Sequence, residues 1–193
     1  MIKAIVFDFG GVFNTAAHFD IIYPILAKRI GVSFDEAREI VKEEWTLCKL
    51  GKISCDQFYE HLGYEFGIEN FRSFWFKSFK YISGMPELVA KLKGKYKLFI
   101  FSNAIKDWFE NQIKELNLDY FDGFVLSYEE GMDKPEIKFY NLLEEKYNLL
   151  SNEILFVDDK LYNLKPAKDL GWDVIHFQSV KQLKEEFEKR SIL

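Results

Sequence analysis

Short apolar runs alternate with longer amphipathic segments along most of this chain, and this alternation constrains its fold more than any other feature. The predicted strands are residues 2–8, 96–101, 121–126, 153–157 and 172–178. The segments with helical periodicity are residues 85–93, 104–117, 136–148, 161–170 and 180–190. Strands that alternate with crossover helices form a parallel sheet with helices on both faces. The sequence therefore predicts an α/β fold.

Residues 15–82 interrupt this alternation, because they contain no predicted strand. They predict four successive helices over residues 18–30, 34–50, 54–66 and 69–82, with Ser33 and Ser54 as N-caps. The last helix places apolar residues on one face, which predicts the core of a helical bundle: Phe71, Phe74, Trp75, Phe79 and Ile82. We expect residues 1–14 and 83–193 to form the sheet domain and residues 15–82 to form an inserted helical domain.

Charge and composition narrow the possible partners. The formal net charge is -5, so no basic stripe is present to bind nucleic acid. No segment approaches the ~20 apolar residues of a membrane-spanning helix, which predicts a cytoplasmic protein without a membrane partner. The two cysteines, Cys48 and Cys55, fit reduced thiols in that compartment better than a disulfide. The sequence makes no prediction about oligomeric state.

Asp8 comes directly after the first apolar run. A carboxylate that follows a buried strand lies at the carboxyl end of the sheet, where open α/β folds bind their ligands. The next residues include Gly10 and Gly11, which allow a sharp turn and the close approach of a ligand. The position suits a nucleophile or a metal ligand, and a turn-capping aspartate is the alternative.

Ser102 and Asn103 come directly after the second predicted strand and before a predicted helix. We expect them to cap that helix. The same geometry presents a hydroxyl and free backbone N–H groups to an anion, so capping and phosphate binding are compatible.

Lys134 precedes Pro135, which suits the first turn of the following helix. Because a cation at a helix N-terminus is unfavourable, helix stability does not explain this lysine. Two interpretations stay open. Lys134 forms a salt bridge with Asp133 or Glu136, or it holds the ionised Asp8 and an anionic ligand together.

Asp158 and Asp159 follow the fourth predicted strand, and Asn163 lies one helical turn into the next helix. Two adjacent carboxylates repel each other, and a divalent cation relieves that repulsion. Carboxylate oxygens suit Mg²⁺, which takes one or two of them from a protein and keeps several waters. The alternative is an acidic pair on the surface.

Together these segments resemble the haloacid dehalogenase (HAD) superfamily. The matching segments are Phe7–Val12, Phe101–Asn103, Gly131–Glu136 and Phe156–Gly171. The resemblance covers the whole core and implies a Rossmann-like domain, and the helical block over residues 15–82 corresponds to the cap of many members. The segment from Asp158 to Gly171 is similar to the phosphatase domains fused to soluble epoxide hydrolases and to bacterial sugar-phosphate phosphatases.

The resemblance implies that Asp8 is the catalytic nucleophile, which attacks phosphorus and forms an aspartyl-phosphate. Asp8 would also bind Mg²⁺, together with the Gly10 carbonyl and Asp159. Lys134 would be the second catalytic residue and would stabilise the nucleophile and the charge that develops during the reaction. These roles suit phosphoryl transfer, which depends mainly on positioning and charge neutralisation.

The resemblance also implies substrate-binding and positioning residues. Ser102 and Asn103 would bind the phosphoryl oxygens, while Asp158 and Asn163 would orient the metal or its waters. The implied activity is magnesium-dependent hydrolysis of a phosphomonoester, with a small phosphorylated metabolite as substrate. The sequence does not identify that metabolite.

One position departs from the family pattern. Family phosphatases usually carry a second aspartate two residues after the nucleophile, as general acid and base, and this chain has Gly10 there. General acid catalysis contributes roughly 10²–10⁴-fold to a rate. We expect either a substrate with a good leaving group, such as an anomeric sugar phosphate or an acyl phosphate, or a replacement acid, with His18 and Asp20 as candidates.

Two other functions stay open. A 2-haloacid dehalogenase would use Asp8 to attack carbon, but such members use no metal and usually replace the acidic pair kept here as Asp158 and Asp159. A non-catalytic phosphate-binding or protein-interaction module is the second alternative, because a fold alone does not establish a function.

Overall fold

A computed structural model describes residues 1–15, 22–116 and 118–193 of the protein. Its strands are β1 (Ala4–Phe7), β2 (Lys97–Ser102), β3 (Gly123–Leu126), β4 (Ile154–Asp158) and β5 (Asp173–His176). They form one parallel sheet in the order β3-β2-β1-β4-β5. The predicted α/β fold is therefore confirmed. All the predicted strands are present, although most are shorter than expected.

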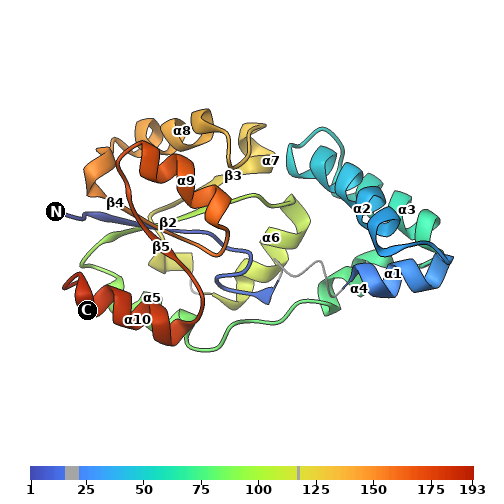
Figure 1. Ribbon diagram of the computed structural model, residues 1–193, viewed down its shortest axis with the longest axis horizontal. Helices are drawn as coiled ribbons and strands as arrows, with labels where there is room; N and C mark the ends of the chain where they lie inside the picture. The colour runs from blue at the N-terminus through green and yellow to red at the C-terminus, as the bar shows by residue number, and fades with distance from the viewer. Residues whose placement is uncertain (16–21, 117) are drawn as a thin grey trace.

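Helices cover both faces of this sheet. The helices of the sheet domain are α5 (Met85–Leu92), α6 (Lys106–Gln112), α7 (Ser127–Glu130), α8 (Ile137–Tyr147), α9 (Leu161–Asp169) and α10 (Val180–Lys189). Short 3₁₀ helices lie at Ile113–Glu115, Leu118–Tyr120 and Ser151–Glu153. In Figure 1, α8 and α9 lie above the sheet, and α5 and α10 lie below it.

Alternate residues of each strand pack against opposite layers. In β1, Ile5 and Phe7 join the apolar cluster that includes Leu183 of α10, whereas Val6 joins the cluster that includes Tyr140 of α8. Every residue of β1 is fully buried. Because both faces of such a strand are buried, the side chains on both faces are apolar, and this explains the continuous apolar runs in the sequence.

The described part of the segment between β1 and α5 contains helices and no strand, as predicted, although the helix ends differ from those expected. It contains α1 (Tyr23–Ile30), α2 (Phe34–Lys49), α3 (Cys55–Phe66) and α4 (Phe71–Lys77). Ser33 and Ser54 each form a capping box with the residue three positions later, as predicted. Figure 1 shows α1–α4 together at the end of the molecule opposite the N-terminus, beyond the carboxyl ends of the strands. These helices therefore form a cap over the edge where Asp8 lies.

Three local predictions are wrong. The fourth cap helix ends at Lys77, so Phe79 and Ile82 belong to the segment that follows it. Helix α6 begins at Lys106, and its N-cap residue Ile105 makes no side-chain capping bond, so Ser102 and Asn103 do not cap it. Helix α8 begins at Ile137 after an N-cap at Glu136, which leaves Pro135 outside its first turn.

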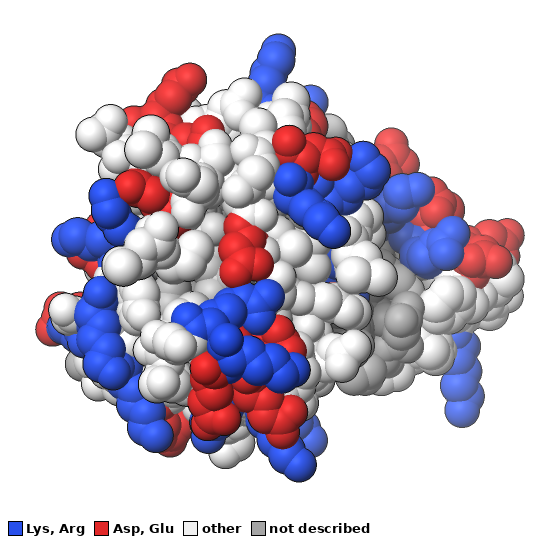
Figure 2. Space-filling view, turned by 60° about the vertical axis from the view of Figure 1, so that its left-hand side comes forward, with Lys and Arg blue, Asp and Glu red and all other residues white. Residues whose placement is uncertain are grey.

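Within the described residues, no helix is long and apolar enough to cross a membrane. Figure 2 shows basic and acidic side chains intermixed on the face that it presents.

Candidate active site

Three carboxylates meet at the carboxyl edge of the sheet. Asp8 follows β1, Asp158 ends the neighbouring β4, and Asp159 follows it. One oxygen from each lies within 4.8 Å of the others. The fold therefore brings together two sequence segments that are far apart in the chain.

Lys134 is buried among these carboxylates. Its Nζ lies 2.7 Å from Asp158 Oδ2 and 3.0 Å from Asp8 Oδ1, and it donates a hydrogen bond to the Phe101 carbonyl at 2.9 Å. Burial opposes the charged form, but the carboxylates of Asp158 and Asp8 outweigh it and raise the pKa of Lys134. A salt bridge to Asp133 is not its role, because Asp133 pairs with Lys49 of the cap.

The environment of Asp8 differs from that of an ordinary surface carboxylate. Burial raises the pKa of Asp8 to about 7, against the opposing attraction of Lys134. The Phe9 backbone N–H donates to Asp8 Oδ1 at 2.7 Å, and Lys134 contacts the same oxygen. These contacts fix the orientation of a carboxylate that faces the cavity described below.

Asn103 holds the segment that carries Lys134. Its Nδ2 donates to the Lys134 carbonyl at 2.9 Å, and the Lys134 backbone N–H donates to Asn103 Oδ1 at 2.8 Å. Ser102 ends β2 with its Oγ buried and without a hydrogen-bond partner among the described residues. Asn103 therefore lines the site and also positions the lysine, a role that sequence reasoning missed because the partners lie 31 residues apart.

Asp158 is fully buried and both of its oxygens are occupied. Asn163 Nδ2 donates to Oδ1 at 3.1 Å and to Oδ2 at 3.0 Å, and the Lys160 backbone N–H donates to Oδ1 at 2.7 Å. The Tyr140 hydroxyl in turn donates to the Asn163 carbonyl at 2.7 Å. Nothing in the sequence pattern singles out Tyr140. This network orients Asp158 toward Lys134.

Asp159 lies in a different environment from the adjacent Asp158. Its Oδ2 lies 3.2 Å from Lys160 Nζ, whereas its buried Oδ1 has no hydrogen-bond partner in the described part of the chain. Gly11 has a φ of 86°, and a Cβ built on it would come within 2.3 Å of the Asp159 carboxylate. Gly11 is therefore required both by its backbone conformation and by the close approach of Asp159.

A cavity of about 600 Å³ opens between the cap and the sheet domain at this point. The sheet domain contributes Asp8, Gly10, Asn103, Trp108, Lys134, Asp159, Lys160, Tyr162 and Asn163. The cap and the segment that follows it contribute Tyr23, Arg38, Trp45, Lys49, Trp75 and Phe79. Sequence reasoning did not identify most of the cap residues, because their place in the cavity depends on how the cap packs against the sheet domain. His18 and Asp20 lie outside the described residues.

An aspartate that follows the central strand, a lysine beside it and an acidic pair on the neighbouring strand define the class of protein. The chain belongs to the haloacid dehalogenase-like hydrolase family, whose family model matches residues 5–177. The expected resemblance is thereby confirmed.

Known proteins of this family are similar over nearly the whole chain. A sesquiterpene phosphatase from Aspergillus oryzae is 31% identical over 90% of this chain and 89% of its own length. A D-ribitol-5-phosphate phosphatase from Bacteroides thetaiotaomicron is 28% identical over 90% of each. A HAD family enzyme from Bacteroides thetaiotaomicron, solved in complex with magnesium and inorganic phosphate, superposes with a TM-score of 0.81 at 22% identity. That comparison covers 97% of this chain and 100% of the solved chain.

Proposed function

We propose that this protein is a magnesium-dependent phosphatase that hydrolyses a small phosphomonoester through an aspartyl-phosphate. The observation that carries the proposal is the convergence of Asp8, Lys134 and Asp159 on one cavity. Two relatives that match most of the chain are named as phosphatases, which supports the same reaction class.

The carboxylates fit a magnesium ion. Three carboxylates with oxygens within 4.8 Å of one another carry more negative charge than Lys134 and Lys160 together neutralise. The buried Asp159 Oδ1, which lacks a partner in the described structure, is the donor that most needs a cation. We propose that Asp8, Asp159 and the Gly10 carbonyl hold the ion, and that Asp158 and Asn163 position these ligands. When bound, Mg²⁺ would neutralise negative charge on the phosphoryl group.

The residues of the chain divide the chemistry between them. The Asp8 carboxylate attacks phosphorus and the ester P–O bond breaks, so that the organic group leaves as an oxyanion that takes a proton from solvent. A water then attacks the aspartyl-phosphate, which regenerates the Asp8 carboxylate and releases phosphate. Lys134 supplies a fixed positive charge beside Asp8, while Ser102 and Asn103 bind the phosphoryl oxygens. The cap limits the entry of water to the cavity during the first step.

Gly10 brings no side chain that protonates the leaving group. We therefore propose that the natural substrate has a leaving group that departs without strong acid assistance. Aryl phosphates of increasing phenol acidity should show a steep rise in kcat/KM if this is so. A flat dependence would indicate that another residue acts as the acid.

The test of the proposed function uses p-nitrophenyl phosphate and a panel of phosphorylated metabolites. Hydrolysis should require Mg²⁺, stop with EDTA and be lost in Asp8→Asn. The exposed Asp169→Asn on α9 is the matched control and should keep full activity. Retained activity in Asp8→Asn would refute the proposal. Chloroacetate turnover that persists in EDTA would favour a dehalogenase, and binding of magnesium and phosphate without turnover would favour a non-catalytic protein.

A further inference from the structure

Aromatic rings form a continuous row along the cavity wall, from the cap to the neighbour of the nucleophile. Trp45 and Trp75 have ring centroids 6.0 Å apart, Trp75 and Phe79 lie 5.6 Å apart, and Phe79 and Trp108 lie 5.8 Å apart. All of these residues line the cavity. We refer to Trp45, Trp75, Phe79 and Trp108 as the aromatic row.

The row reaches the catalytic end of the cavity. The Trp108 ring packs edge-on against Phe9 at 5.5 Å, and Phe9 follows Asp8 directly in the chain. Trp108 and Asp8 both line the cavity, so an ester whose phosphorus lies at Asp8 would have the aromatic row on the cavity wall beside its organic group.

The remaining cations of the cavity already face acidic partners. Lys49 pairs with Asp133, and Lys160 lies 3.2 Å from Asp159. Arg38, on the exposed side of α2, lies beside two acidic residues of its own helix. Among the described cavity residues, no lysine or arginine beyond these and Lys134 is present to bind a second anionic group of a substrate.

We propose that this site selects phosphate monoesters whose organic group is a hydrocarbon that leaves without strong acid assistance, such as an aryl group, in preference to polyol or sugar phosphates. The inference rests on the proposed function and deepens it. A cavity of about 600 Å³ is large enough to bury such a group. Burial of each methylene contributes about 0.8 kcal/mol, which corresponds to about a four-fold gain in affinity. A hydroxyl group that lies against the ring faces of the aromatic row would instead lose its hydrogen bonds to water, and buried hydroxyls without partners are costly.

The experiment measures binding separately from turnover. Isothermal titration of the Mg²⁺-loaded protein with n-alkyl phosphonates, from ethyl to octyl, should show the dissociation constant falling about four-fold per methylene until the cavity is filled. Phosphonates with hydroxyl groups on the same carbon chain should show no such gain. A dissociation constant that is independent of chain length, or lower for the hydroxylated series, would overturn the inference.

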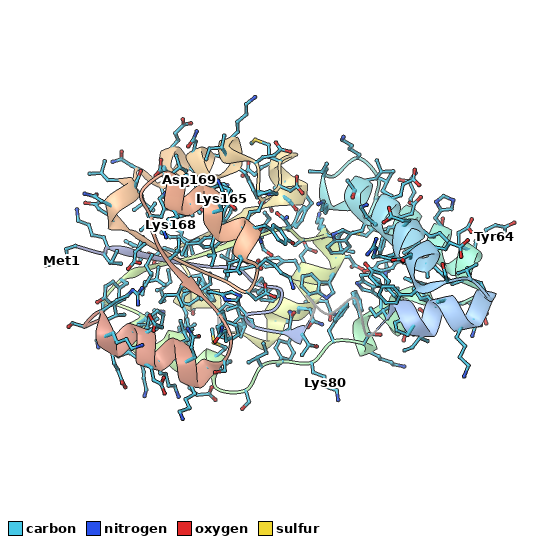
Figure 3. All side chains as sticks on the ribbon, in the orientation of Figure 1. Met1, Tyr64, Lys80, Lys165, Lys168 and Asp169 are labelled. Atoms are coloured by element: carbon cyan, nitrogen blue, oxygen red, sulfur yellow. The ribbon has the colours of Figure 1, made fainter. Side chains whose placement is uncertain are left out.

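Two variants test the position of the bound chain. Trp45→Ala should weaken binding of octyl phosphonate at least ten-fold, roughly the affinity contributed by two methylenes, and should leave inorganic phosphate binding unchanged. Tyr64→Ala is the control, because Tyr64 is exposed at the far end of the cap, as Figure 3 shows. Equal loss of octyl phosphonate affinity in both variants would overturn the assignment to the aromatic row.

The outcomes separate this inference from the proposed function. Hydrolysis of phosphomonoesters with no effect of chain length on binding would overturn the inference and leave the phosphatase proposal intact. Binding that tightens with chain length, without hydrolysis of any ester, would refute the phosphatase proposal and support a hydrocarbon-binding site. Failure of every phosphonate to bind would overturn the inference.

Discussion

Lys134 is the residue whose replacement tests the electrostatics of the site most directly. Its side chain is 1% exposed, and its ammonium group contacts the carboxylates of Asp8 and Asp158 and the Phe101 carbonyl. Lys134→Met keeps the length and apolar stem of the side chain and removes the charge. Two buried carboxylates then lose their cation, while the packing around the stem changes little.

The expected magnitude follows from the burial of the partners. The Asp158 side chain is 0% exposed and that of Asp8 is 10% exposed, so water screens neither carboxylate well. Removing one partner of such a buried pair costs about 3–5 kcal/mol. Since domains are stable by about 5–15 kcal/mol, the metal-free variant should lose a large part of its free energy of unfolding.

The pH dependence has a definite sign. Burial raises the pKa of Asp8 to about 7 even with Lys134 present, and removal of the lysine raises it further. A carboxyl group whose pKa is higher in the folded state destabilises the folded protein increasingly as pH rises above its unfolded value. The cost of Lys134→Met should therefore be largest above pH 7 and should shrink under acidic conditions, where Asp8 takes up a proton.

Urea denaturation in EDTA measures this cost. Lys165→Met is the matched control: Lys165 is 78% exposed and pairs with Asp169 on the outer side of α9 (Figure 3), and such helix pairs contribute about 0.3–0.5 kcal/mol. The double variant Lys134→Met with Asp158→Asn removes one uncompensated charge and should recover part of the loss. A Lys134→Met cost that equals the Lys165→Met cost, or that does not change with pH, would refute the electrostatic reasoning.

Three further predictions concern Gly11, the proposed magnesium site and the two cysteines of the cap. Gly11→Ala should destabilise the protein by about 1–3 kcal/mol and weaken Mg²⁺ binding, because the new Cβ would overlap the Asp159 carboxylate. Gly94→Ala is the control, because Gly94 has a similar positive φ but open space around it; this variant should lose less stability and keep its Mg²⁺ affinity in a titration. Mg²⁺ affinity measured by calorimetry should rise about ten-fold from pH 6 to pH 8, because the ion displaces the Asp8 proton, and a flat profile would contradict the elevated pKa. The sulfur atoms of Cys48 and Cys55 lie 3.8 Å apart, so an oxidising disulfide reagent should remove two hydrogen atoms and join them in an intramolecular disulfide, which the intact mass of the protein would detect. Two thiols that still titrate after that treatment would contradict the prediction.

The sequence predicted the parts of the fold that depend on local pattern. The strands are continuous apolar runs because both faces of the sheet are covered, and the cap helices carry their own start signals at Ser33 and Ser54. Helix ends were less predictable. The apolar face of the fourth cap helix continues through Phe79, although the helix stops at Lys77, since the chain there turns back toward the sheet domain.

The candidate site likewise contains residues that the local sequence pattern indicated and contacts that it did not. The residue types and their places along the chain grouped Asp8, Lys134, Asp158 and Asp159 as candidate site residues. The structure brings these four side chains together at one edge of the sheet, and their roles stay predictions. The prediction that Asn103 caps a helix was wrong because a distant partner, the Lys134 backbone, takes both ends of its amide group. Contacts between segments far apart in the chain leave no local signal in the residues that make them.

The hydrogen bonds of the acidic residues are consistent with the separate roles that the family resemblance implies for them. Asp158 has both oxygens occupied by donors from Lys134, Asn163 and the Lys160 backbone, so it is suited to hold other groups in place. Asp159 keeps one buried oxygen without a partner in the described chain, so it is suited to a cation. Lys134 and the Phe9 backbone N–H both contact Asp8 Oδ1, and Asp8 lines the cavity. Asp158 and Asp159 thus have different surroundings, because β4 ends at Asp158, whose side chain is buried in the protein, whereas the Asp159 side chain lies beside Gly11 and lines the cavity.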